Sequence, residues 1–223
     1  MTMKRLASPA PPLTVLLTGF DAFAGETINP SWLAAQALHG EILQGHLMVA
    51  AQLPTEFAAS GKRLADLLRQ HEPALVLCIG LAGGRASLSL ERIAINIQDA
   101  RIADNIGAQP IDAPVIESGP AAYFSTLPIK AMLQALTAAN IPAEVSQTAG
   151  TFVCNHVFYV LMHVLKKQGG TPKARGGFVH VPYLQGQGLP CMTLEDMVRG
   201  LRAAIDCALT TGDDAFFSAG ALN

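Results

Sequence analysis

Three short apolar runs, separated by two segments with helical periodicity, constrain the fold of this chain more than any other feature. The runs are Leu13–Thr18, Leu47–Leu53 and Ala74–Ile79. Each has the length and composition of a buried strand. Between them, one helix is predicted from Asn29 to about Leu38, and another over Glu56–Gln70, where apolar residues recur at helical spacing. This β-α-β-α-β order predicts a sheet with helices on its faces and functional residues at the carboxyl ends of its strands.

The rest of the chain continues the alternation of strands and helices. The further predicted strands are Leu88–Ile97, Ala121–Leu127, Ala143–Gln147 and Gly177–Tyr183, and the further predicted helices are Ile129–Ala139, one that begins near Cys154, and Thr193–Leu209. We therefore expect a single α/β domain over residues 13–212. A flexible, proline-interrupted tail is expected over residues 1–12, and a frayed C-terminal tail over residues 213–223.

Composition argues against several classes of function. Half of the 223 residues are hydrophobic, 14% are charged, and the formal net charge is −2. Such a chain can form a large core, and its lack of basic runs argues against nucleic acid or an anionic membrane surface as a partner. No apolar run reaches the roughly 18 residues that a membrane helix needs. Because no export signal is recognised, we expect a cytoplasmic protein with reduced thiols and no membrane partner.

Among the four cysteines, Cys154 has the position best suited to chemistry. No two cysteines have CxxC spacing, which argues against a zinc site, and we predict no metal and no cofactor. In SQTAGTFVCNHVFYVLMHVL, which is Ser146–Leu165, a short strand turns into an apolar helix with Cys154 in its first turn. Thr151 is a candidate N-cap, and a helix N-terminus favours a thiolate with a lowered pKa. The alternative is that Cys154 is a small buried hydrophobe.

A carboxylate inside an apolar strand is the second unusual feature. In SLSLERIAINI, Glu91 shares one side of a period-two strand with the three isoleucines that follow it. Because an isolated buried charge is costly, Glu91 needs a partner. It either orients a catalytic base or forms a structural ion pair with Arg85 or Arg101. The glycine-rich GLAGGR before this strand lacks the GxGxxG and P-loop patterns, which argues against a nucleotide site.

Of the six histidines, His180 is the best placed to act on Cys154. The others are His39, His46 and His71 in polar surroundings, and His156 and His163 on the helix of Cys154, neither of which is expected to face the thiol. His180 lies near the end of a strand, and a parallel neighbour would bring it to the same sheet edge as the thiol. A base must come within about 3 Å of the group that it deprotonates. Glu91, Cys154 and His180 therefore form a candidate triad if their segments end at one edge.

Four segments also carry a resemblance to a known family. They are GFDAFAGETINPSW, GLAGGRASLSLERIAINIQDARIADN, SQTAGTFVCNHVFY and GGFVHVPY. From about Leu13 to Leu209, in register, the chain resembles pyroglutamyl peptidase I, also called pyrrolidone-carboxylate peptidase. The resemblance implies a three-layer α/β/α sandwich with a mixed, mostly parallel central sheet. It also implies a cytosolic cysteine exopeptidase, often a homotetramer, that hydrolytically removes an N-terminal pyroglutamyl residue (5-oxoproline) from peptides through a thioester.

The same resemblance assigns roles to particular residues. The acid falls on Glu91, the nucleophile on Cys154 and the histidine on His180. The candidate substrate-binding residues are Phe20, Phe23, Asn29 and Arg101. The two phenylalanines resemble those that line the pyroglutamyl ring pocket, whereas composition alone favours core plugs in a loop. As partners we expect peptides with an N-terminal pyroglutamate and, as a homo-oligomer, a tetramer or a dimer.

The chain departs from the family pattern in three places. Leu81 stands where many members have Gln, Ala103 replaces a common Pro, and the segment between Tyr183 and Thr193 is short. None of these changes touches the triad positions, but Leu81 could alter the polarity of the pocket. The alternatives are a protein that binds pyroglutamyl-capped N-termini without turnover, or a nucleoside phosphorylase or peptidyl-tRNA hydrolase of similar layering. The last two need a phosphate cradle and a basic face, and the sequence shows neither.

Overall fold

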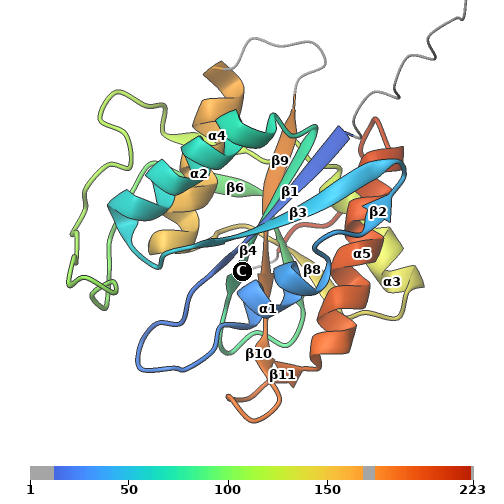
Figure 1. The fold of residues 1–223 in the computed structure, drawn as a ribbon, viewed down its shortest axis with the longest axis horizontal. Helices are drawn as coiled ribbons and strands as arrows, with labels where there is room; N and C mark the ends of the chain where they lie inside the picture. Colours follow the sequence, from blue (N-terminus) through green and yellow to red (C-terminus); the bar gives the residue numbers. More distant parts are fainter. Residues whose placement is uncertain (1–12, 168–173, 222–223) are drawn as a thin grey trace, which may run out of the picture.

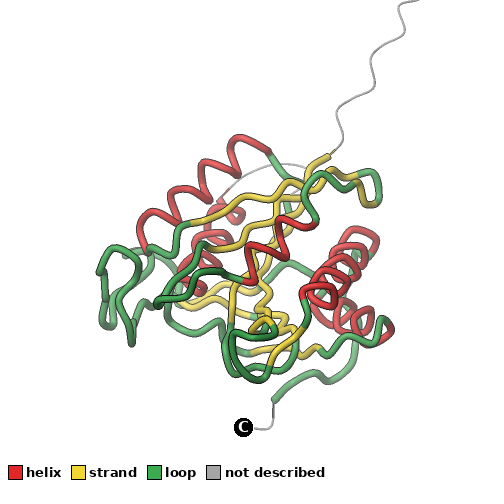
Figure 2. The backbone as a smooth tube through the Cα atoms, turned by 60° about the horizontal axis from the view of Figure 1, so that its bottom comes forward, coloured by secondary structure: helices red, strands yellow, loops and turns green. Residues whose placement is uncertain are grey.

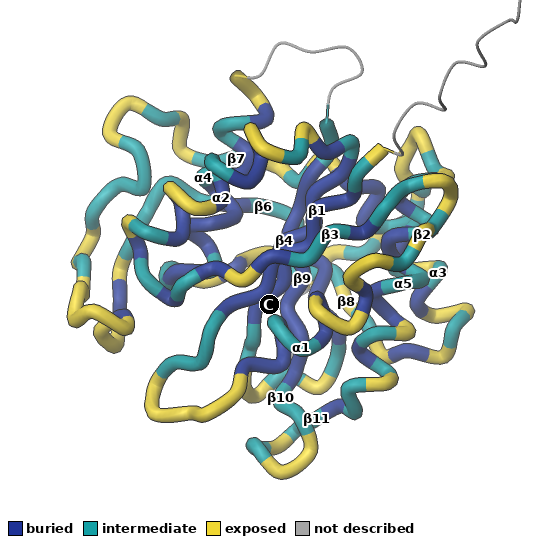
Figure 3. Tube along the Cα trace, viewed as in Figure 1, coloured by how far each residue is buried: buried dark blue, intermediate teal, exposed yellow. Residues whose placement is uncertain are grey.

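A seven-stranded sheet in the order β2-β3-β1-β4-β9-β5-β8 forms the centre of the protein (Figure 1). The computed structural model describes residues 13–167 and 174–221. The strands of this sheet are β1 (Leu13–Phe20), β2 (Ile42–Leu43), β3 (His46–Leu53), β4 (Leu75–Leu81), β5 (Leu88–Glu91), β8 (Ala143–Ser146) and β9 (Arg175–Val181). Most are short apolar runs of largely buried residues (Figure 3). This is the pattern expected of mainly parallel strands that helices cover on both faces.

The strand directions make the sheet mixed but mostly parallel. β1 pairs in parallel with β3 and β4, and β4 pairs in parallel with β9. β5 pairs in parallel with β8 but antiparallel with β9, and β2 is antiparallel to β3. The predicted sheet type is confirmed, and β9, the last long strand in the sequence, lies in the interior of the sheet.

Helices cover both faces of the sheet, so the predicted three-layer α/β/α sandwich is confirmed (Figure 2). The helices are α1 (Pro30–Ala37), α2 (Phe57–His71), α3 (Ile129–Ala138), α4 (Val153–Lys167) and α5 (Leu194–Thr210). α1, α3 and α5 pack on one face and α2 and α4 on the other, and a separate buried apolar cluster fills each interface. In the part of the chain that is described, no helix is both long and apolar enough to cross a membrane.

The helix starts follow the capping residues in the sequence. Asn29 precedes α1, and its side-chain oxygen accepts from the backbone N–H of Ser31. Thr193 caps α5 by accepting from the N–H of Asp196, as predicted. In α1 and α5, a polar side chain before the helix thus satisfies N–H groups that have no partner inside the helix.

The predicted strand Leu88–Ile97 is wrong as a single element. It divides into β5 and β6 (Ile93–Ile95), and β6 leaves the main sheet to pair with β7 (Ala122–Phe124). The break occurs because the backbone partners change: the Gly176 carbonyl of β9 accepts from Thr126 instead of from an extension of β5. Glu91 therefore shares its strand face with Ser89 and not with the isoleucines that follow it, although it is fully buried.

The described part of the predicted C-terminal tail, 213–221, has irregular backbone but makes specific contacts. The Asp214 carboxylate accepts from the backbone N–H groups of Lys130 and Ala131 in the first turn of α3. The Arg92 guanidinium donates to the carbonyl of Ala219. The predicted N-terminal tail, 1–12, lies outside the described residues.

Candidate active site

A cleft of about 760 Å³ opens where β4 and β9 end and α4 begins. Its walls carry Cys154 from α4, His180 from β9, and Arg85 from the connection between β4 and β5. Phe23, Arg101 and Phe152 also line it. The carboxyl ends of parallel strands thus hold the candidate residues, as the chain order predicts.

A glycine on β4 lets the thiol approach the sheet beside the histidine. Gly80 is the register partner of His180 in the parallel β4–β9 pair. A Cβ at Gly80 would lie only 2.8 Å from Cys154 Sγ and 2.8 Å from the Phe178 ring. No larger residue fits there without displacing the sulfur, so Gly80 creates the space in which thiol and sheet meet.

The start of α4 differs from the prediction that Thr151 caps it. The Thr151 hydroxyl donates to the Asp99 carbonyl at 2.7 Å, and the Asp99 N–H donates to the Thr151 carbonyl at 3.1 Å. The first helical hydrogen bond instead runs from the N–H of His156 to the carbonyl of Phe152. Thr151 therefore ties the turn to the loop after β6, and Cys154 is the second residue of the helix.

The thiol of Cys154 also differs from the predicted thiolate. Burial raises its pKa to about 12; the Glu91 carboxylate and Cys78 push in the same direction, and the Arg85 guanidinium opposes them. Desolvation of the charged form is the largest cause of this shift, so burial favours the protonated thiol. Its reactivity then depends on a base that removes the proton during attack.

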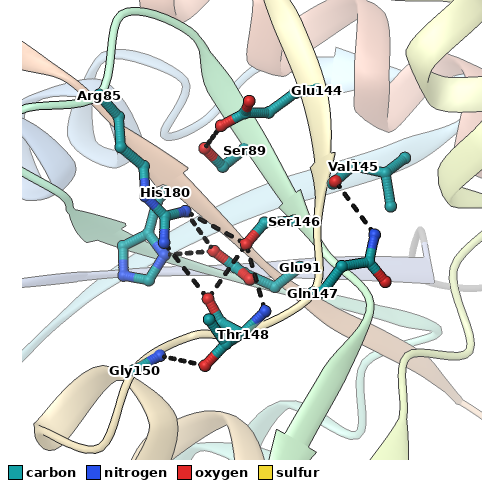
Figure 4. Close-up of polar contacts among 10 residues, drawn as sticks. All are labelled: Arg85, Ser89, Glu91, Glu144, Val145, Ser146, Gln147, Thr148, Gly150 and His180. Carbon is teal, nitrogen blue, oxygen red and sulfur yellow. Dashed lines mark hydrogen bonds and ion pairs between the residues drawn. The ribbon is translucent and has the colours of Figure 1, made fainter. Parts of the chain in front are cut away.

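Glu91 holds the histidine and an arginine with one carboxylate oxygen. Its Oε1 lies 2.7 Å from His180 Nδ1 and accepts from Arg85 Nη1 at 2.8 Å (Figure 4). Glu91 has no exposed surface, and no described residue hydrogen-bonds to its buried Oε2. Both interpretations left open by the sequence apply, since Glu91 orients the imidazole and also forms an ion pair. The ion-pair partner is Arg85.

The described residues show no hydrogen bond between the Cys154 sulfur and the His180 ring, although both line the same cleft. Glu91 occupies Nδ1, which leaves Nε2 as the nitrogen that can take the thiol proton. Catalytic hydrogen bonds are often long in a free enzyme and shorten when substrate binds. The predicted three-residue constellation is therefore brought together, with the acid–base contact formed.

Three aromatic rings surround a small hollow beside the thiol. The hollow has a volume of about 10 Å³, and its lining residues are Phe20, Phe23, Asn29, Thr55, Leu81, Phe152, Val153 and Cys154. Phe20 is only 2% exposed and its ring centroid lies 6.5 Å from that of Phe178, so it is both a core residue and a wall of the hollow. Phe23 is half-buried and its centroid lies 6.2 Å from that of Phe152.

Sequence reasoning missed Phe152 as a site residue. It sits two positions before Cys154, and it lines both the cleft and the hollow. An aromatic residue next to a candidate nucleophile at the start of a helix is a signal that could have identified it.

Asn29 and Arg101 lie at the site in different ways. Both polar groups of Asn29 are used within the protein: Oδ1 accepts from Ser31, and Nδ2 donates to the Asp21 carbonyl at 2.9 Å. Asn29 therefore shapes the loop that carries Phe23. Arg101 is exposed on the cleft wall and does not pair with Glu91.

The remaining buried histidine lies behind the site. Burial lowers the pKa of His156 to about 4, its Nδ1 contacts Gln98 Oε1 at 2.9 Å, and its ring packs on Phe57 of α2. It faces away from the thiol, as the helical spacing predicts. Across the described residues, no group of three or more His, Cys, Asp or Glu side chains could hold a metal ion.

The fold and this site together define a class of protein, a hydrolase of the cysteine peptidase type on an open α/β/α sheet. The model of the Peptidase_C15 family, described as pyroglutamyl peptidase, matches residues 13–211. The chain belongs to this pyroglutamyl peptidase family.

Individual relatives cover nearly the whole chain. A pyrrolidone-carboxylate peptidase of Cupriavidus taiwanensis is 55% identical over 216 residues, which is 94% of this chain and 99% of that protein. One of Bacillus cereus is 51% identical over 206 residues, 90% of this chain and 95% of its own length. The crystal structure of pyroglutamyl peptidase I from Bacillus amyloliquefaciens superposes with a TM-score of 0.89 at 42% identity, covering 93% of this chain and 100% of that one.

Proposed function

We propose that Cys154, His180 and Glu91 are the nucleophile, the base and the orienting acid of a peptidase that removes an N-terminal pyroglutamyl residue. The observation that carries this proposal is the 2.7 Å contact between His180 Nδ1 and Glu91 Oε1, in a cleft that Cys154 also lines. A carboxylate on Nδ1 fixes the orientation of an imidazole and stabilises its protonated form.

In the first half of the reaction, Cys154 Sγ attacks the carbonyl carbon that joins pyroglutamate to the next residue, while His180 Nε2 takes the thiol proton. The negative charge that develops on the carbonyl oxygen is stabilised by N–H groups in the first turn of α4, which have no partner within the helix. Arg101, exposed on the cleft wall, adds positive charge nearby. Collapse of the intermediate breaks the C–N bond, His180 gives its proton to the leaving amine, and a thioester remains.

In the second half, His180 takes a proton from water, which attacks the thioester carbonyl. The C–S bond breaks, the proton returns to the sulfur, and pyroglutamate leaves. Because burial raises the pKa of the Cys154 thiol, the attack depends on transfer of its proton to His180. Glu91 contributes most when the imidazolium is formed.

The aromatic hollow is the proposed site of the pyroglutamyl ring. A lactam carries no charge and has flat faces, so apolar rings such as Phe20, Phe23 and Phe152 suit it. The hollow of about 10 Å³ has room for about one water molecule, so its walls must separate when the ring enters.

Peptides with an N-terminal pyroglutamate are the proposed substrates. A homo-oligomeric state, tetramer or dimer, and a cytoplasmic location stay predictions. The alternative, a binder of pyroglutamyl-capped N-termini without turnover, has the same pocket but needs no oriented base.

One assay separates the two possibilities. We expect the purified protein to release the fluorophore from a pyroglutamyl amide and to lose this activity after alkylation of its thiols. A proline amide lacks the ring carbonyl, and we expect it to be cleaved far more slowly, since a site that hydrogen-bonds the lactam leaves its own polar groups unpaired with proline. Tight binding of the pyroglutamyl amide without any release would instead establish the binder.

Phe23→Ala should lower kcat/KM for pyroglutamyl amides by about tenfold or more, because an aromatic face contributes roughly 0.5–1.5 kcal/mol beyond burial. The melting temperature should change little, since Phe23 is half-buried. Phe20→Ala should also lower kcat/KM. In addition, it should lower the free energy of unfolding by about 3–5 kcal/mol, because Phe20 is a core residue as well. Phe124→Ala, at an aromatic residue 66% exposed, is the control. Wild-type kinetics in Phe23→Ala would place the ring pocket elsewhere.

A further inference from the structure

We propose that Arg85 is a positioning residue that keeps the buried Glu91 carboxylate ionised and aimed at His180. The proposal rests on the proposed function, since it assigns a role to Arg85 in the same reaction. Arg85 follows the glycine-rich turn after β4 and reaches back over the end of β5.

Arg85 contacts the buried acid from the solvent side of the site. Its Nη1 donates to Glu91 Oε1 at 2.8 Å, the oxygen that also meets His180 Nδ1 at 2.7 Å (Figure 4). The Arg85 side chain is 29% exposed, whereas that of Glu91 is 0% exposed and that of His180 5%. Part of the guanidinium therefore remains near solvent, while Nη1 pairs with a charge that water cannot reach.

Glu91 needs this cation when His180 is neutral. A carboxylate buried without compensation is costly and takes up a proton instead. No described residue hydrogen-bonds to Glu91 Oε2. Arg85 is then the cation that holds Glu91 in the ionised form, which is the form that stabilises the imidazolium during attack.

A second set of contacts links the acid to the helix of the nucleophile. Arg85 Nη1 also lies 3.4 Å from Ser146 Oγ, and Nη2 donates to the Thr148 carbonyl at 3.3 Å. Ser146 ends β8, and the turn that contains Thr148 leads directly into α4. Arg85 therefore joins the strand of the acid to the turn before Cys154. One side chain thus holds the acid and the turn that positions the nucleophile.

The chain offers a matched control at Arg92. This arginine follows β5 and bonds the same β8–α4 turn, with Nε donating to Gln147 Oε1 at 2.9 Å and Nη2 donating to the Ala219 carbonyl at 3.2 Å. It has no contact with Glu91 among the described ion pairs. Arg92→Gln removes a cation and a link to the turn without touching the acid.

Several other ionisable groups surround the Glu91–His180 pair. Besides Glu91, His180 and Arg85, they are Cys154 on α4, Cys78 on β4, Glu144 on β8, and Asp99, Arg101 and Tyr183 on the cleft walls. The pKa values of Cys154 and Cys78 are both raised to about 12 by burial, so neither thiol titrates on the acid side of neutrality. Asp99→Asn tests the contribution of Asp99 to the acid limb. If that variant leaves the limb in place, a shift of the limb in an Arg85 variant reports the Glu91–His180 pair.

The test is the pH dependence of kcat and kcat/KM on a pyroglutamyl amide for wild type, Arg85→Gln, Arg85→Lys, Arg92→Gln and Asp99→Asn. We expect Arg85→Gln to lower kcat about 10- to 100-fold with little change in KM, and to move the acid limb to higher pH, because Glu91 then takes up a proton more readily. Arg85→Lys keeps the charge and should restore the position of the limb while kcat recovers in part. Arg92→Gln should behave as wild type.

A double-mutant cycle guards against a purely structural effect. In the Glu91→Gln background, Arg85→Gln should cost less than threefold in kcat, because the charge that it serves is gone. Equal losses in both backgrounds, or an Arg85→Gln profile that matches Arg92→Gln, would overturn the proposal. A wild-type enzyme without pyroglutamyl hydrolysis would instead overturn the proposed function, so the two failures are distinguishable.

Discussion

Cys154→Ala should abolish pyroglutamyl hydrolysis, with a loss in kcat of roughly a million-fold on the scale of other nucleophile–histidine–acid hydrolases. The reason is that the variant lacks the sulfur that forms the covalent intermediate. Cys154→Ser should also be inactive, because an alcohol is a far weaker nucleophile in a site shaped around sulfur. Steady-state assays with a fluorogenic pyroglutamyl amide, together with melting temperatures, measure both changes.

The matched controls for Cys154 are the two other partly exposed cysteines. Cys191 lies in the short strand β11 (Cys191–Met192), which pairs with β10 (Tyr183–Leu184), and Cys207 lies in α5. Cys191→Ala and Cys207→Ala should keep full kcat. The alkylation rate of Cys154 in the free enzyme should rise with pH above about 9, since its pKa is raised to about 12. Full activity in a protein alkylated at Cys154 would contradict the mechanism.

Glu91→Gln should lower kcat by about 10³- to 10⁴-fold while KM changes little. Glutamine keeps the shape of the side chain, but it is neutral and cannot stabilise the imidazolium that forms as Cys154 attacks. It also leaves Arg85 without its buried anion, so a lower melting temperature is expected as well. Kinetics measured well below the melting temperature of the variant separate the two effects, because all of the enzyme is then folded.

Glu144→Gln is the control for a carboxylate on the neighbouring strand. Glu144 accepts from Ser89 Oγ at 2.8 Å and is exposed, so its charge faces solvent outside the site. Its loss should leave kcat unchanged. If Glu91→Gln also retains wild-type kcat, Glu91 serves only as the structural partner of Arg85.

Much of the fold could be predicted from local patterns. The alternation of apolar runs and helical periodicity located the principal strands of the sheet and the five helices of the described residues. These elements bury one face or both, so their apolar residues recur with the period of the element. Capping also acts locally, and Thr193 was identified for that reason. The division of Leu88–Ile97 could not be foreseen, because it depends on Thr126 taking the carbonyl of Gly176.

The site was predictable in its chemical groups but not in their state. Glu91, Cys154 and His180 are unusual in their segments, and the family resemblance assigned a role to each of them. The pKa of Cys154 was misjudged because a helix N-terminus is visible in the sequence, whereas burial against Gly80 and Phe178 is a tertiary effect. The sequence indicated Arg85 only as an alternative partner of Glu91. Residue spacing does not show that a single carboxylate oxygen of Glu91 contacts both Arg85 and His180.

The position of β9 has a consequence for biosynthesis. β4 and β5 are close in the sequence but separated in the sheet by β9, which is made about 85 residues after β5 begins and carries His180. As the chain leaves the ribosome, the two parts of the sheet cannot join until Val181 has emerged, and until then both keep an unpaired edge that can aggregate. Completion of the sheet and arrival of the base are therefore the same event, so a chain interrupted before β9 has neither a closed core nor a working site.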